Sequence, residues 1–342
     1  MTLRINQTQL SATSGAYGIM AYVLTLLNFS PAVKNSKFEA FGYFTDSDPA
    51  NCNPFQFDGF GTRAMLTDQS KDYHLVAPLW HGLAFQNRAI PSMVPLFLAF
   101  DLQDPKFVIK SGVATAATTN NDFIYEIKNP VLRVKRVKCI DSVVHRFEQE
   151  LVRQTLKFPY LHYSIRSFII PKGVRTINFH DVFGTSFLPR NAAVFLLPQD
   201  WVAGSFKSSP LNFTPNNIKE ICFYANDSER IPSLPYNLDF SSNSKNYLHA
   251  FLSLFGNDGL MRDETNGIDM GFWSKHATIF MFWLMHVREH QSISILIYIF
   301  ASLLFKWLGK RELVYEKKKN KKKKKVWNMY VTACRLREKE RV

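Results

Sequence analysis

Cysteine is scarce in this sequence of 342 residues, and the four cysteines lie far apart. They are Cys52, Cys139, Cys222 and Cys334, so no two of them form a CxxC pair. A disulfide-stabilised scaffold or a zinc ribbon needs cysteines at short, paired spacings. The sequence therefore argues against both classes, and it predicts a reduced, intracellular setting in the cytoplasm or the nucleus.

Motifs that bind nucleotides or support catalysis are also missing: there is no P-loop, no Rossmann-type glycine motif, no GxSxG and no HExxH. A lone GxG at Gly59-Phe60-Gly61 is expected to be a turn in a loop. His286 and His290 have the i, i+4 spacing of two metal ligands, but no third ligand lies near them in the sequence. The oxygen-rich stretch 263–269 misses the spacing of a calcium loop, so we expect a solvated loop there. We predict no enzymatic activity, no catalytic or metal-binding residue and no cofactor.

The body of the chain has little net charge, and the excess of basic residues is concentrated at its end. The formal net charge is +14, but residues 306–342 contain fifteen Lys or Arg against four Asp or Glu, which is +11. The remaining residues carry only +3. Because so small an excess neutralises few phosphates, we predict that the body binds no nucleic acid specifically.

Aromatic residues, in contrast, are abundant: they make up 14% of the chain, with 30 phenylalanines. Such large, flat side chains favour pleated, half-buried surfaces and therefore strands. Helical spacing predicts a helix over 17–29. Residues 131–137 would place apolar and basic side chains on both faces of a strand, and this mixed pattern is typical of a strand at the edge or rim of a sheet. Short apolar runs separated by turn residues predict further strands at 38–44, 74–80, 93–100 and 107–111.

A stripe with helical periodicity predicts one amphipathic helix over 141–157, with Val144, Phe147 and Leu151 on one face. Because strand-like stretches lie on both sides, we place a domain boundary at 141–158 and expect the helix to pack on a sheet. Residues 159–286 consist of short strand-like runs between Pro, Gly and Asn turns, which indicates an all-β sandwich. The sequence thus predicts a mainly β chain with two units, residues 1–140 and 159–286.

Residues 287–342 differ from the rest of the chain in their composition. An uncharged run covers 15 residues from Gln291 to Phe305, and Ile293 to Phe305 is almost wholly apolar. A membrane helix needs about 20 residues, so this run is long enough only if Lys306 snorkels and the segment continues to residue 308. We therefore expect a helix that either contacts a membrane through 291–308 or lies against the body of the protein.

A lysine-rich block follows the apolar run. Its members are Lys317, Lys318, Lys319, Lys321, Lys322, Lys323, Lys324 and Lys325. Such a block can act as a nuclear-localisation signal or bind anionic lipids, and translation of an adenine-rich stretch of the gene is an equally open explanation. In each case we expect a frayed, solvated end.

Several phrases in the sequence resemble, in their order and spacing, the capsid-like proteins of Polinton/Maverick elements, which are integrated virus-like elements. The resemblance covers about residues 1–282. It is carried by residues 5–8, YGIMAYVLTLLN (17–28), Gly61-Thr62-Arg63, IKNPVLRVKRVKC (127–139), FPYLHYSIRSFIIPKG (158–173), LPRNAAVFLLPQDWVAGSFKSSPLNF (188–213), IPSLPYNLDF (231–240), YLHAFLSLFG (247–256) and TIFMF (278–282).

The resemblance implies a double jelly-roll fold, a structural role in a virion without catalysis, and partners that are further copies or other capsid-like subunits. The first jelly roll looks incomplete, and the family's closing strands look lost after Phe282. We therefore expect a remnant of a capsid subunit: two jelly-roll-like units joined by a helix, followed by a helical hydrophobic and basic tail. The alternative hypothesis is a membrane-anchored β-domain protein with a short basic cytoplasmic tail.

Overall fold

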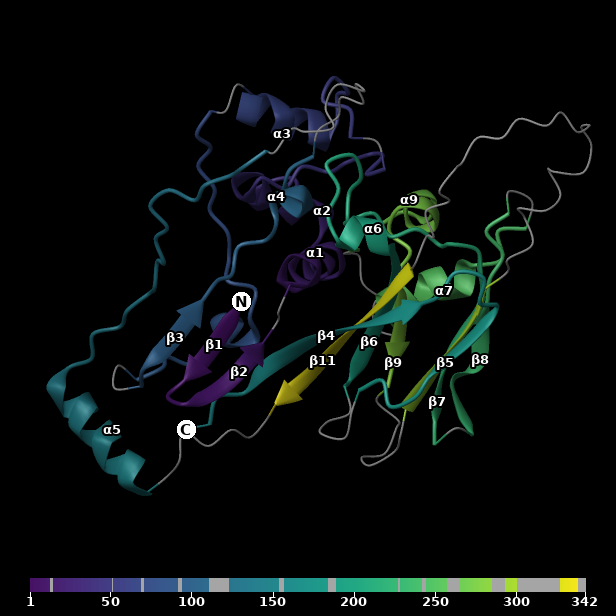
Figure 1. Ribbon diagram of the computed structural model, residues 1–342. Coiled ribbons are helices and arrows are strands. Elements are labelled where there is room, and N and C mark those ends of the chain that lie inside the picture. Colours follow the sequence, from purple (N-terminus) through teal and green to yellow (C-terminus); the bar gives the residue numbers. More distant parts are fainter. Residues whose placement is uncertain are drawn as a thin grey trace, which may run out of the picture.

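The chain combines helices with three antiparallel sheets in a computed structural model (Figure 1). It is therefore a mixed α and β protein, and the mainly β character expected for the whole chain is not confirmed. We call residues 1–153 the N-terminal region and residues 157–337 the C-terminal region. The structure describes residues 1–12, 15–50, 52–68, 71–91, 94–110, 123–153, 157–183, 189–226, 228–241, 244–256, 265–284, 293–299 and 327–337.

The described part of the N-terminal region is dominated by helices and irregular segments. Its sheet has three strands in the order β2-β1-β3. A jelly-roll-like unit over residues 1–140 is not confirmed. The elements are β1 (Thr2–Ile5), β2 (Thr8–Ala12), α1 (Tyr17–Asn28), α2 (Pro31–Lys34), the 3-10 helix η1 (Lys37–Phe41), α3 (Gly59–Thr67), the 3-10 helix η3 (Gly82–Phe85), β3 (Leu96–Ala99), α4 (Pro105–Val108) and α5 (Asp141–Arg153).

The helix expected over 17–29 is confirmed as α1, and it belongs to the core of the C-terminal region. Ile19, Val23 and Leu26 recur at helical spacing, are buried, and pack in the same hydrophobic core as the strands of that region. The rings of Tyr22 and Phe213 lie 5.9 Å apart across the same contact. Helix α1 therefore fastens the N-terminal region to the C-terminal one (Figure 1).

Most strands expected in the N-terminal region are wrong. Residues 38–44 begin in η1, residues 107–111 begin in α4, and residues 74–80 and 131–137 form neither helix nor strand. Only the run at 93–100 contains a strand, β3. A strand needs a neighbouring ladder, and in the described part of this region the only sheet has three short strands.

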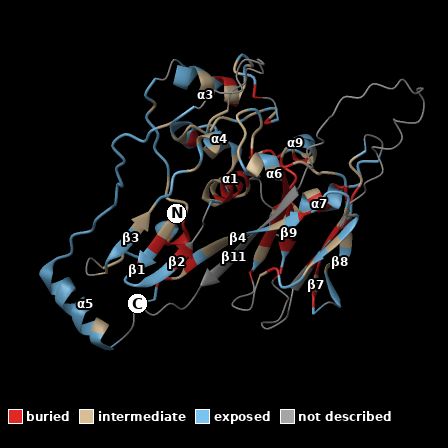
Figure 2. Ribbon diagram, viewed as in Figure 1, coloured by how far each residue is buried: buried red, intermediate tan, exposed pale blue. Residues whose placement is uncertain are grey.

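The amphipathic helix expected over 141–157 is confirmed as α5 over its first thirteen residues, but its expected packing on a sheet is wrong. Figure 1 shows α5 standing away from the sheets, and in Figure 2 it is almost entirely exposed. Val143, Val144 and Phe147 are exposed, and Val152 is 88% exposed. The apolar face of α5 is thus left without a partner among the described residues.

The C-terminal region contains eight of the described strands, arranged in two four-stranded antiparallel sheets with the orders β5-β10-β7-β8 and β4-β11-β6-β9. Short helices connect some of these strands. The elements are β4 (Tyr160–Ile170), β5 (Thr176–Phe179), β6 (Asn191–Pro198), α6 (Gln199–Val202), β7 (Ile218–Ala225), β8 (Glu229–Asn237), α7 (Leu248–Leu252), the 3-10 helix η4 (Ser253–Phe255), α9 (Met270–Lys275), β9 (Phe280–Trp283), β10 (Ile293–Ile299) and β11 (Trp327–Arg337).

The pairing of these eight strands follows one rule. The first strand pairs with the last (β4 with β11), the second with the second-last (β5 with β10), the third with the third-last (β6 with β9), and the middle two (β7 and β8) with each other. Two further ladders, β11 with β6 and β10 with β7, join these pairs into the two sheets. The chain is thus folded as one long antiparallel hairpin that is rolled up.

The expected C-terminal helical tail is wrong for two segments. Residues 293–299, the first half of the apolar run, form strand β10 in the interior of one sheet, and residues 327–337 form β11 in the interior of the other. Ile295 and Ile297 are fully buried. Both segments therefore belong to the same two sheets as the strands of residues 159–286.

Aromatic and branched side chains fill the space between the two sheets. Strand β6 is a continuous apolar run and is buried on both faces, as expected for a strand covered on each side. Phe195 and Trp273 are fully buried, and the Trp273 indole N–H donates to the carbonyl oxygen of Ile279 at 3.1 Å. Part of the phenylalanine content noted in the sequence thus supplies this core, including Phe195, Phe213 and Phe223.

Candidate functional site

Asp58 and two glycines fix the beginning of α3. The Asp58 carboxylate caps the helix by accepting the N–H of Gly61 at 3.0 Å. A Cβ on Gly59 would lie 2.4 Å from the carbonyl oxygen of Phe44, and one on Gly61 would lie 2.0 Å from that of Gln56. The GxG is therefore the first turn of a capped helix rather than the expected turn in a loop, and both glycines allow close backbone contact.

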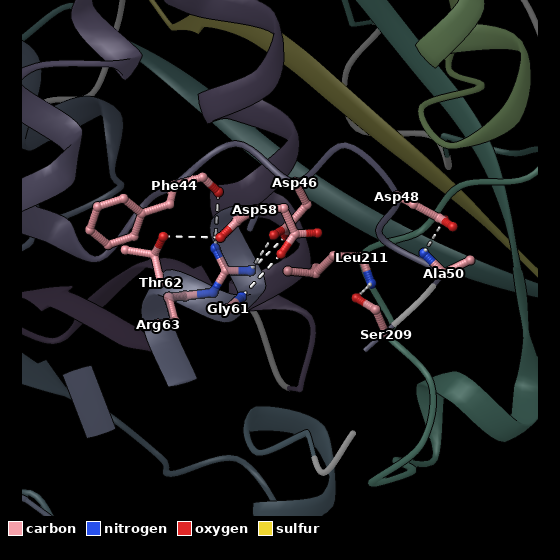
Figure 3. Close-up of polar contacts among 10 residues, drawn as sticks. All are labelled: Phe44, Asp46, Asp48, Ala50, Asp58, Gly61, Thr62, Arg63, Ser209 and Leu211. Carbon is pink, nitrogen blue, oxygen red and sulfur yellow. Dashed lines mark hydrogen bonds and ion pairs between the residues drawn. The ribbon is translucent and has the colours of Figure 1, made fainter. Parts of the chain in front are cut away.

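Arg63 lies one turn further along α3, at the centre of the cluster in Figure 3. Its guanidinium donates to both carboxylate oxygens of Asp46, at 2.8 and 2.6 Å, and to the carbonyl oxygen of Phe44 at 2.9 Å. Burial raises the pKa of Asp46, and the Arg63 charge opposes that rise. This bidentate pair holds residues 44–46 against α3. Gly61-Thr62-Arg63, noted in the sequence, thus has a structural role: it connects α3 to the loop that contains residues 44–46.

A buried lysine connects the two regions. The Nζ of Lys34 donates to the carbonyl oxygen of Leu26 at 2.8 Å, near the end of α1, and to that of Asn266 at 2.6 Å. Burial lowers the pKa of Lys34 to about 8. Lys34 therefore satisfies carbonyl oxygens from both regions at once.

His276 forms a second polar connection between the regions. Its Nε2 lies 3.6 Å from the Asp48 carboxylate, and its Nδ1 lies 3.2 Å from Oδ1 of Asn212. Burial lowers the pKa of His276, and Lys275 lowers it further, while Asp48 raises it. The imidazole of His276 thus links Asp48 of the N-terminal region to Asn212 of the C-terminal region.

Metal-binding patterns from the sequence find no support among the described residues, where no group of three His, Cys, Asp or Glu side chains could hold an ion. His286 and His290, and the first two residues of 263–269, lie outside the described residues. Asp269 caps α9 by accepting the N–H of Phe272 at 2.8 Å.

A wide cleft separates the body of the N-terminal region from residues 123–140 and α5. Its volume of 3870 Å³ is several times the roughly 300–1,000 Å³ of small-molecule pockets. Apolar side chains line both sides, including Leu75 and Leu96 on the body and Val131 and Phe147 opposite. A space of this size and lining suits a protein segment better than a small ligand.

One wall of the cleft is formed by residues 127–140, which we call the basic segment. All of its residues are exposed. Within the described part of the chain, the backbone of residues 127–139 makes no hydrogen bond to another backbone group. Lys128 pairs with Asp72 of the body at 2.8 Å. The segment contains no carboxylate, and its other cations are Arg133, Lys135, Arg136 and Lys138.

The membrane segment expected from Ile293 to Phe305 does not form a helix at its beginning, because residues 293–299 are strand β10. Phe305 lies outside the described residues, as do Lys317, Lys318, Lys319, Lys321, Lys322, Lys323, Lys324 and Lys325 of the basic tail. Among the helices that the structure describes, none has the length and apolar character needed to span a bilayer.

Comparisons with known proteins give one informative similarity. No protein-family model matches the chain. The chain is 25% identical over 300 residues to the uncharacterized protein F54H12.2 of Caenorhabditis elegans, which covers 85% of this chain and 67% of that protein.

Two exposed features were not singled out as sites from the sequence. The sequence pattern predicts a strand for the basic segment, and its excess of cations is visible in the same residues. A second feature lies beside α3, where Phe55, Phe57 and Met65 are exposed; we call these three residues the α3 loop patch. Only the structure identifies it, because the composition of a short aromatic stretch does not distinguish core from surface.

Proposed function

We propose that this chain is a structural protein of the capsid type, derived from a Polinton/Maverick-like element, and that its C-terminal region is a jelly roll. It acts by assembling with further copies or with other capsid-like subunits inside the cell, and it carries out no catalysis. Its rigid walls and exposed loops serve subunit contacts.

The observation that carries the proposal is the pairing order of the eight strands. Pairing first with last, second with second-last, and so on inward, gives two four-stranded sheets from one rolled hairpin. This pairing order supports an eight-stranded jelly roll, an architecture common in capsid proteins and also found in lectins and cupins. Because the fold alone does not choose among these functions, the ordered sequence resemblance over residues 1–282 favours the capsid class.

The α3 loop patch supports a role in assembly. Phe55 is 83% exposed and Phe57 is fully exposed, although burying such side chains is strongly favourable. The membrane-anchored alternative has less support, because the first half of its apolar run belongs to β10.

Assembly of the full chain tests the proposal. Sedimentation velocity and negative-stain electron microscopy at rising concentration should reveal large particles of uniform size. Replacing the patch phenylalanines (Phe55→Ser with Phe57→Ser) should shift the chain to small species. Leu234→Ser, a matched change of an exposed residue in β8, should not. A chain that stays monomeric at all concentrations, or that responds equally to both changes, would contradict the proposal.

A further inference from the structure

The basic segment has the side-chain pattern of a strand but lacks a strand partner. A pleated conformation would place Val131, Arg133, Lys135 and Val137 on one face, so that apolar and basic side chains share each face of the segment. Val131 is 77% exposed. Asn129, with a positive φ, and Pro130, which has no N–H, precede the extended part of the segment, and the backbone N–H and C=O groups from 131 to 139 find no backbone partner within the described residues. It therefore presents a row of free ladder positions, which is what a sheet edge offers.

The surroundings leave room for an added strand. The segment borders the large cleft, and Val143, Val144 and Phe147 of α5 continue its apolar surface into the same space. Figures 1 and 2 show this part of the chain standing clear of the sheets and exposed along its length. An extended peptide bound along the segment would cover apolar side chains of the segment and of α5.

We propose that the basic segment is a docking edge for a β-strand of a partner protein that carries both carboxylates and apolar side chains on each of its faces. Ladder hydrogen bonds would bind the main chain, and Arg133, Lys135, Arg136 and Lys138 would select the carboxylates. The proposal does not depend on a capsid role, because it rests on the geometry and charge of this segment alone.

Charge decides against a second copy of this chain as the occupant. Two copies of the segment would bring together eight cations besides Lys128, which already pairs with Asp72, and the segment contains no carboxylate to offset them. Like charges on paired strands are destabilising. An acidic partner strand turns the same charges into attractive cross-strand pairs.

Nucleic acid is a poorer fit than an acidic strand. The segment has no aromatic side chain on which bases could stack. Its valines and leucine would gain no favourable contact beside phosphate groups. Apolar side chains of a partner strand, in contrast, could pack against them. The observations therefore favour a protein partner.

Binding of a synthetic peptide to the full chain tests the proposal. The probe is a fluorescein-labelled eight-residue peptide that, in antiparallel register, places glutamate opposite each cation and valine opposite each apolar residue of 131–138. Its binding is measured by fluorescence anisotropy. Val134→Pro, which blocks ladder formation without changing charge, should weaken binding about tenfold or more. Replacing two cations, Arg133→Gln with Lys135→Gln, should weaken it by a similar factor.

Three controls separate the possible outcomes. Lys172→Gln with Arg175→Gln removes the same charge from an exposed turn elsewhere and should leave binding unchanged. The same peptide with N-methyl groups on alternate amides keeps its charge but cannot form the ladder, so it should bind at least about tenfold more weakly. Circular dichroism verifies that each variant is folded.

Several results would overturn the proposal. Equal binding of the N-methylated peptide would indicate charge attraction alone, and tighter binding of a ten-nucleotide thymidine oligomer would indicate a nucleic-acid site. A dimer of the full chain that Val134→Pro dissociates would identify a second copy as the occupant. No binding of the parent peptide at low salt would also reject the acidic strand.

Discussion

The two regions of this molecule use apolar side chains in opposite ways. In the C-terminal region, the strands of two sheets enclose a large core that includes Phe195, Phe213 and Trp273. In the N-terminal region, a small core includes Leu3, Ile5 and Leu10, and most of the large apolar side chains exposed in the described chain lie in this region, up to Val152. Figure 2 shows the contrast between buried and exposed ribbons.

The difference follows from strand pairing rather than from composition. Both regions contain short apolar runs of similar length. In the C-terminal region each run finds a ladder partner, so its side chains are held in register on one face of a sheet. The basic segment is also rich in β-branched valine, yet it remains unpaired among the described residues. An apolar pattern therefore produces a core only where the topology supplies a second strand.

The largest contrast is expected from the same substitution in both regions. Val331 lies in the middle of β11, paired with Arg166 on one side and Val194 on the other. Val331→Pro removes a ladder hydrogen bond from an interior strand and should lower the free energy of unfolding by roughly 3 kcal/mol or more. Val134→Pro, in the unpaired basic segment, should change it by less than about 0.5 kcal/mol. Urea denaturation measures both, and equal effects would refute the central position of β11.

A second pair of substitutions compares a buried with an exposed phenylalanine. Phe195 is fully buried, and its ring centre lies 4.5 Å from that of Phe213. Phe195→Ala should cost roughly 3–5 kcal/mol of stability, because it leaves a cavity in the core. Phe147→Ala on α5 should cost less than about 1 kcal/mol. A large cost at Phe147 would mean that α5 is packed in solution.

The smallest effect tests the junction between the regions. His81 is buried against Tyr160 of β4, and its Nδ1 accepts the N–H of Leu83 at 3.1 Å. Burial, with a smaller contribution from His162, lowers the pKa of His81 to about 4. The unfolded chain takes up a proton as the pH falls through about 6.5, whereas the folded chain does so only near 4.

The buried, neutral His81 therefore contributes fully to the free energy of unfolding above pH 6.5. This contribution is lost as the pH falls toward 4, by up to roughly 3 kcal/mol. His81→Asn keeps an acceptor for the Leu83 N–H but does not titrate. Its stability should fall less than that of the original chain between pH 7.5 and pH 4.5, measured by urea denaturation. An unchanged pH dependence would show that His81 is not buried as a neutral group.

Some elements could be predicted from the sequence because their signals are local. Helices α1 and α5 follow from periodic apolar positions, and strand β6 follows from a continuous apolar run. The fastening around Arg63 could not be predicted, because Asp46 and Phe44 reach it through a loop whose path depends on close contact at Gly59 and Gly61.

The sequence by itself determined the aromatic-rich core, the two amphipathic helices and the cationic character of the basic segment. Only the tertiary structure decided that residues 293–299 are a strand and that residues 131–137 are not. A short apolar run is compatible with either helix or strand, so its conformation depends on its partners. For β10 these partners are Thr176–Phe179 and Ile218–Ala225, more than 60 residues earlier in the chain, and local sequence carries no record of such a pairing.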